Sequence, residues 1–183
     1  MYFKEAGKHN SEKTVELAVR TARERSISTI VVASRTGATA RMLAHHPGLK
    51  VVCVTHVQGF AEPGKNEMAE ATRRELEEAG IAVLTTTHVL SGAERALSKS
   101  FGGVYPVEIV SHTLRMFGQG LKVCVEVAVM ALDAGLIEAV KPIIAIGGTT
   151  DGVDTAIIVV PAHASRILET RICEIICKPS LLP

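Results

Sequence analysis

Short apolar runs rich in β-branched residues alternate along this chain with segments of helical periodicity. The runs have the length and composition of buried strands and cover residues 29–33, 50–55, 81–86, 142–146, 155–160 and 171–177. Around the first three runs, residues 11–25 and 66–79 place apolar side chains at the i, i+3, i+4, i+7 spacing of an amphipathic helix. The repeated unit is strand, helix, parallel strand, which predicts an α/β fold.

Two further helices are expected in the middle of the chain. Pro106 stands at a first-turn position and opens a helix that ends at Gly118, and residues 121–134 form a helix that is apolar nearly all round. The connection 147–154 is too short for a parallel crossover, which takes a dozen or more residues. We therefore expect the strand at 155–160 to run antiparallel to its predecessor, in one three-layer α/β/α domain over residues 1–183 with a mostly parallel mixed sheet.

Composition and charge narrow the class of protein. Lys and Arg total 20 and Asp and Glu total 19, and no window concentrates enough basic residues to follow a phosphate backbone. The longest apolar stretch, residues 121–132, contains Lys122 and Glu126 and is shorter than the roughly 18 apolar residues of a membrane span. The first ten residues carry charges and no apolar signal segment. We expect a cytoplasmic protein that binds neither nucleic acid nor membrane.

Cysteine and aromatic residues add two expectations. The cysteines stand inside apolar runs with no C-x-x-C spacing, which favours buried, reduced thiols at Cys53, Cys124, Cys173 and Cys177. Aromatic residues make up 3% of the chain and Trp is absent, so the sequence does not predict an aromatic cage around a ligand.

The residues that follow the first parallel strand form the best candidate site. In open α/β sheets, ligands bind beyond the carboxyl ends of the strands, where loops and helix N-termini converge. The residues at this position are Ser34, Arg35, Thr36, Gly37 and Thr39. Hydroxyl groups, a glycine and the free N–H groups of a helix start suit a phosphate group. The alternative is a hydroxyl-rich helix cap without a ligand.

Two histidines follow the next two strands in the same local sequence, Thr-His-Val. The polar and glycine positions there are Thr55, His56 and Gly59 after one strand, and Thr87, His88, Ser91 and Gly92 after the other. An imidazole titrates near neutrality, so His56 and His88 are candidate catalytic residues that bind a ligand or exchange a proton. Two surface histidines on loops are the alternative. No metal-ligand partner stands at a diagnostic spacing, so we expect no zinc site.

The remaining candidate site residues lie in the connection 147–154 and at Glu126. Flexible backbone and polar side chains for a second set of ligand contacts come from Gly147, Gly148, Thr149 and Asp151. A tight turn would need the same glycines. Glu126 stands on the apolar helix, where an unpaired carboxylate is costly. We expect it either to pair with Arg95 or Arg115 or to act at the ligand.

The hydroxyl-glycine loop between two strands resembles the C-terminal domain of pyruvate kinase, in which such a loop binds phosphate groups of a sugar effector. Over nearly its whole length the sequence is similar to the stand-alone prokaryotic pyruvate kinase C-terminal domain-like family, also called pyruvate kinase alpha/beta domain proteins. The segments that carry this likeness are residues 2–3, 7–8, 32–34, 59–60, 88, 90–92, 94–95, 120–126, 147–148, 154–156 and 161–163.

The resemblance implies a mixed sheet and, from family members seen with a ligand, bound flavin mononucleotide (FMN). It implies no established reaction. Arg35 departs from the kinase domain, which usually has Lys or a similar residue before its hydroxyl and glycine, and no segment corresponds to the catalytic barrel. The resemblance therefore does not imply kinase activity. The aromatic residues placed to meet a flavin ring are Phe60, Tyr105 and Phe117.

Two functions of different classes follow from these observations. The first is a protein that holds FMN by its phosphate at the carboxyl rim of the sheet and acts as a flavin-dependent oxidoreductase. The second is a non-catalytic sensor or regulatory module that binds a phosphorylated effector at the same rim. The expected partner is a phosphorylated small molecule, and assembly into a homo-oligomer stays open.

Overall fold

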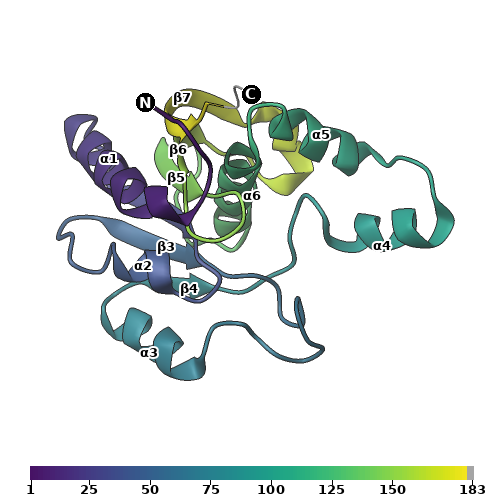
Figure 1. Ribbon diagram of the computed structural model, residues 1–183, viewed down its shortest axis with the longest axis horizontal. Coiled ribbons are helices and arrows are strands. Elements are labelled where there is room, and N and C mark those ends of the chain that lie inside the picture. Colours follow the sequence, from purple (N-terminus) through teal and green to yellow (C-terminus); the bar gives the residue numbers. More distant parts are fainter. Residues whose placement is uncertain (181–183) are drawn as a thin grey trace.

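A seven-stranded mixed sheet forms the centre of the molecule (Figure 1). The computed structural model describes residues 1–180, and within them the strands follow the order β1-β7-β6-β5-β2-β3-β4. Their bounds are β1 Tyr2–Phe3, β2 Thr29–Ala33, β3 Lys50–Val54, β4 Ala82–Leu84, β5 Ile143–Gly147, β6 Thr155–Val160 and β7 Arg171–Pro179.

Strand directions confirm the mostly parallel mixed sheet. β2, β3, β4 and β5 are parallel, and β1 is parallel to β7. β6 runs antiparallel to both of its neighbours, β5 and β7, as the short connection before it requires. β2 lies between β3 and β5, so the chain leaves β2 toward one side of the sheet and returns on the other. In α/β sheets such a switch point is where ligands bind.

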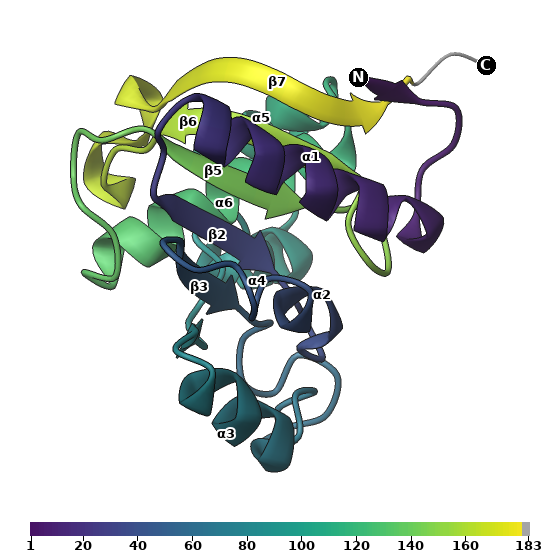
Figure 2. The ribbon, with the colours of Figure 1, turned by 90° about the vertical axis from the view of Figure 1, so that its left-hand side faces the viewer.

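Helices cover both faces of the sheet, which confirms the three-layer arrangement (Figure 2). The helix bounds are α1 Ser11–Glu24, α2 Ala38–Arg41, α3 Glu70–Glu78, α4 Gly92–Phe101, α5 Pro106–Arg115 and α6 Gln119–Asp133, with short 3₁₀ helices at Lys8–Asn10 and Ala164–Glu169. Along β2, the side chains of Ile30 and Val32 pack in one hydrophobic cluster with α1, whereas Val31 packs in a second cluster with α6. This alternation follows from the two-residue period of a strand.

The elements that the sequence did not predict are those with little buried surface. α4 contains no buried residue and reaches away from the sheet in Figure 1, and β1 consists of only two residues. Cys53, Cys124 and Cys177 are buried as expected, but the expectation was wrong for Cys173, because the first half of β7 is exposed. Within residues 1–180, each helix is too short or too polar to cross a bilayer.

Candidate functional site

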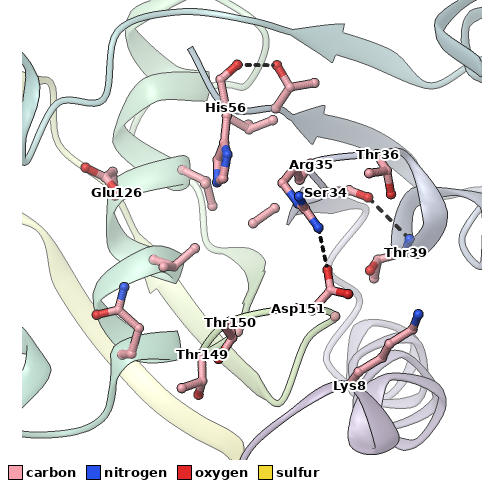
Figure 3. A pocket seen from close by; sticks show the side chains of 18 of the residues that line it. Lys8, Ser34, Arg35, Thr36, Thr39, His56, Glu126, Thr149, Thr150 and Asp151 are labelled. Carbon is pink, nitrogen blue, oxygen red and sulfur yellow. Dashed lines mark hydrogen bonds and ion pairs between the residues drawn. The ribbon is translucent and has the colours of Figure 1, made fainter. Parts of the chain in front are cut away.

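A cavity of about 750 Å³ opens at the carboxyl ends of β2, β3 and β5, beside α6 (Figure 3). Its volume lies in the range of small-molecule sites, roughly 300 to 1,000 Å³. The sequence-predicted residues that line it are Ser34, Arg35, Thr36, Thr39, Thr55, His56, His88, Ser91, Gly148, Thr149 and Asp151. Most of the predicted side chains therefore face one space, although they come from four separate segments.

Five predicted positions lie outside the cavity lining. Gly37 turns toward α3: a Cβ on it would lie 2.6 Å from Cγ2 of Thr72, so its freedom serves helix packing. Gly147 packs the sheet against α6, where a Cβ would lie 2.6 Å from the carbonyl oxygen of Gly120. The other three are Gly59, in the loop after β3, and Thr87 and Gly92, which line a smaller neighbouring hollow.

Ser34 organises the loop that was expected to hold a phosphate. Its side chain is buried, and its Oγ accepts hydrogen bonds from the N–H groups of Thr39 at 3.2 Å and Ala40 at 3.5 Å. These N–H groups begin α2, which is a single turn and carries only a small dipole. The helix start therefore offers less to an anion than the sequence suggested. Hydroxyl groups of Thr36 and Thr39 and the ammonium group of Lys8 border the cavity instead.

Arg35 links two carboxylates across the opening of the cavity. Its guanidinium donates to Glu67 at 3.0 Å and to Asp151 at 3.1 Å, and these hydrogen bonds raise the pKa of Arg35. Burial acts to raise the pKa of Glu67, but hydrogen bonds from Arg35 and His56 outweigh it, so the net shift is downward. The other oxygen of Glu67 lies 2.6 Å from Nδ1 of His56. A carboxylate only accepts hydrogen bonds, so Nδ1 of His56 carries the proton and Nε2 is left for a ligand.

His56, His88 and Phe60 form an aromatic cluster on the cavity wall. Ring centroids are 4.0 Å apart for His56 and Phe60, 5.5 Å for the two histidines, and 5.7 Å for Phe60 and His88. Nε2 of His88 lies 3.3 Å from the N–H group of Val57 and accepts its hydrogen bond, so the proton of His88 sits on Nδ1. Of the three aromatic residues expected near a flavin, Phe60 alone lines this cavity; Tyr105 caps α5, outside it.

The pKa of His88 is lowered, chiefly by burial. Glu126 opposes this shift, whereas His56, Lys122 and Arg95 add to it. The unfolded chain therefore binds a proton at a higher pH than the folded chain. Below about pH 6.5, the free energy of unfolding is expected to fall as the pH drops through the folded pKa.

A variant isolates this effect. His88→Gln keeps an acceptor for the N–H group of Val57 and removes the titration. Urea unfolding at pH 7.5 and pH 5.5 should show a loss of stability that is smaller in the variant, by under about 1 kcal/mol because His88 is partly exposed to solvent. The same pH dependence in both proteins would contradict the assignment.

Glu126 pairs with a residue that the sequence reasoning did not consider. Its Oε2 accepts a hydrogen bond from Nζ of Lys122, one turn earlier on α6, and its Oε1 accepts the N–H group of Leu90 at 2.9 Å. The expected partners Arg95 and Arg115 were wrong, because the i, i+4 spacing on one helix brings Lys122 closer. Lys122 and Glu126 are both buried, and both line the cavity.

Asp154 holds two rim segments in place. It is fully buried and accepts hydrogen bonds from the N–H group of Gly7 at 3.0 Å and from the hydroxyl groups of Thr149 at 2.6 Å and Thr155 at 2.8 Å. These bonds tie the segment before α1 to the loop after β5, and each segment contributes cavity residues. Asp154 is therefore an internal anchor rather than a ligand group.

The chain is similar to one protein family and to several solved structures. The family model described as pyruvate kinase, alpha/beta domain, matches residues 12–159. The chain belongs to the pyruvate kinase alpha/beta domain family. A solved pyruvate kinase from Cryptosporidium parvum is similar at 18% identity, over 82% of this chain and 23% of that chain, with a TM-score of 0.43. The Cryptosporidium parvum pyruvate kinase in complex with ADP gives 20% identity over 74% of this chain and 20% of that chain, with a TM-score of 0.38.

This pyruvate kinase alpha/beta domain spans about a fifth of the length of those two kinases. Its family membership confirms the resemblance drawn from the sequence. The cavity residues that sequence reasoning missed include Lys8 and Lys122, and Glu67 behind Arg35 was missed as well. A signal was present for Lys122, because a lysine and a glutamate four residues apart on one helix lie side by side on the same face.

Proposed function

We propose that this pyruvate kinase alpha/beta domain protein binds a phosphorylated small molecule with a planar ring, and that FMN is this ligand. One observation carries the proposal: the aromatic cluster of His56, Phe60 and His88 shares a cavity with the hydroxyl-rich loop after β2. Stacking on aromatic side chains suits a flat ring, and hydroxyl and basic groups suit a phosphate.

The charges around the cavity favour an anionic ligand. The basic residues in its lining are Lys8, Arg35, Arg95, Arg115 and Lys122, and the acidic ones are Glu12, Glu126 and Asp151. Five formal positive charges therefore face three negative charges, apart from the histidines. A concave site with an excess of one charge attracts ligands of the opposite charge.

A phosphate would bind at Arg35 by exchange with Asp151. The side chains of Arg35 and Asp151 are 42% and 58% exposed, and an exposed ion pair of this kind contributes at most about 1 kcal/mol. A phosphate offers more acceptor oxygens than the carboxylate that it replaces and forms charge-assisted hydrogen bonds with a guanidinium. Glu67 would keep Arg35 oriented throughout, through the opposite side of its guanidinium.

The two imidazoles are suited to polar groups on a bound ring. Nδ1–H of His88 is a donor, and its lowered pKa keeps this histidine neutral near pH 7. Nε2 of His56 is available to a ligand while Nδ1 is held by Glu67. A bound flavin would supply the capacity to take up and release electrons, and the residues of this chain would position it and exclude water from one face.

Two substitutions at the cavity opening should change FMN affinity in opposite directions. Arg35→Gln removes a charge-assisted hydrogen bond to the phosphate and should weaken FMN binding about tenfold. Asp151→Asn removes the competing carboxylate and should strengthen binding a few-fold. Flavin fluorescence titration measures both effects, and riboflavin, which lacks the phosphate, is the control ligand. Equal effects of Arg35→Gln on riboflavin and FMN would contradict the phosphate position.

Purification without added ligand provides the first test of the proposal. We expect a yellow protein that releases FMN on denaturation; a colourless protein that also fails to take up FMN would refute the flavin assignment. Reduction of the bound flavin by a nicotinamide nucleotide, followed by reoxidation by an added acceptor, would identify an oxidoreductase. Inertness to every donor together with a ligand-dependent change in assembly would identify the sensor function instead.

A further inference from the structure

A second group of basic side chains faces the cavity from its α6 side, across from the loop after β2. Lys122 lies on α6, Arg115 ends α5 and Arg95 lies on α4, and all three line the cavity. Figure 3 places Glu126, the partner of Lys122, on the wall opposite Thr36 and Thr39. Lys122, which pairs with Glu126, therefore lies across the cavity from the proposed phosphate position.

The partners of these three cations leave positive charge uncompensated. Lys122 pairs with Glu126, whose other oxygen is already used by the N–H group of Leu90. Arg115 is half-buried and donates to the side-chain oxygens of Gln119 and Ser111, both at 2.7 Å, and both of these groups are neutral. Among residues 1–180, Arg95 makes no ion pair within 4.0 Å. Within the described part of the chain, Glu126 is the one carboxylate within ion-pair distance of these three cations; Glu108 lies further off, where Arg95 helps to lower its pKa.

Arg95 and Arg115 both lie close enough to Lys122 to act on its charge. Burial is the first cause of the lowered pKa of Lys122, and Arg115 and Arg95 lower it further against the attraction of Glu126. Like charges gathered in a partly desolvated site oppose each other and destabilise the charged forms. An anion bound between them would offset this repulsion. The neutral partners of Arg115 also hold its guanidinium in one orientation before any ligand arrives.

We propose that Arg95, Arg115 and Lys122 form a second oxyanion subsite, which takes the carboxylate or phosphate group of a substrate that binds beside the first ligand. The planar fork of a guanidinium matches both groups and can hold two of their oxygens at once. Ser91, directly before α4, also lines the cavity. The inference rests on the proposed function only for the identity of the first ligand; the subsite itself requires no flavin.

Calorimetric titration tests the subsite with two simple probes, malonate and inorganic phosphate, on the full chain with and without saturating FMN. We expect saturable binding in both states. Arg115→Gln should lower the affinity for the better probe at least about tenfold, because it removes a charge-assisted contact. The control Lys99→Gln removes one charge from an exposed position of α4 outside the cavity and should change the affinity less than twofold. Tighter binding of malonate would assign a carboxylate, and tighter binding of phosphate a phosphoryl group.

The outcomes separate this inference from the proposed function. Absence of saturable binding, or an equal loss in Lys99→Gln and Arg115→Gln, would overturn the subsite. So would a loss of FMN affinity in Arg115→Gln as large as that in Arg35→Gln, because the FMN phosphate would then occupy this position. Anion binding that depends on Arg115 in a protein that does not bind FMN would support the subsite and refute only the flavin. Arg95→Gln, at an exposed position, repeats the test if Arg115→Gln does not fold.

Discussion

Asp154→Ala is expected to lower the free energy of unfolding by about 3 to 5 kcal/mol. The carboxylate is fully buried and accepts three hydrogen bonds, from Gly7, Thr149 and Thr155. Hydrogen bonds to a charged group contribute roughly 1.5 to 3 kcal/mol each, and a buried N–H group left without an acceptor costs more than a hydroxyl that can rotate. Equilibrium unfolding in urea measures the loss.

The same substitution should weaken ligand binding, because it releases the two segments that Asp154 joins. Lys8 follows Gly7, and Asp151 lies two residues beyond Thr149, so both sides of the cavity opening would lose their anchor. Asp154→Asn is the matched control. It keeps one acceptor oxygen and the volume of the side chain, and it should cost about half as much. Equal stability losses for alanine and asparagine would show that the hydrogen bonds are not the source of the effect.

The central strands were predictable because most of their side chains are buried, on both faces of the sheet. β2 and β6 lie where the apolar runs placed them, since a parallel or central strand covered by helices reads as a continuous run of Val and Ile. The length of the connection 147–154 was enough to give the direction of β6. α4 was missed for the opposite reason. Its apolar residues, such as Leu97 and Phe101, are exposed, so its pattern carried no core-facing signal.

The position of the site at the rim of the sheet was predictable, but the ion pairs between its residues were not. Strand ends gather at one edge of a parallel sheet, which is why His56 and His88 come within 5.5 Å of each other although 31 residues separate them. Ion pairs between distant segments depend on loop geometry that local sequence does not determine. The sequence placed Asp151 at the rim but gave no sign that it pairs with Arg35, and it did not single out Glu67.

The contacts of the glycines at the rim were likewise not predictable from the sequence. Gly37 reads as a position for close approach of a phosphate, yet the backbone there has a φ of +88° and the missing side chain makes room for α3. Gly152, in the same loop as Asp151, also has a positive φ, and a Cβ on it would lie 2.7 Å from Cα of Lys8. A sequence identifies where a glycine is needed, whereas the element that it accommodates becomes clear only from the packed structure.

The buried pair on α6 gives the second large effect. Lys122→Met should lower the free energy of unfolding by about 3 to 5 kcal/mol, because it leaves the carboxylate of Glu126 buried without its cation. Glu126→Gln should cost a similar amount, since Lys122 is then buried beside Arg95 and Arg115 with no counter-charge, although the glutamine oxygen still accepts the N–H group of Leu90.

The double variant Lys122→Met with Glu126→Gln distinguishes a coupled pair from two independent contacts. With both charges removed, no uncompensated charge remains, and the stability should return to within about 1 to 2 kcal/mol of the parent chain. Urea unfolding of the four proteins at pH 7 completes the cycle. If the stability loss of the double variant equals the sum of the two single losses, Lys122 and Glu126 stabilise the fold independently. That result would contradict the pairing on which the net positive charge of the α6 side of the cavity is based.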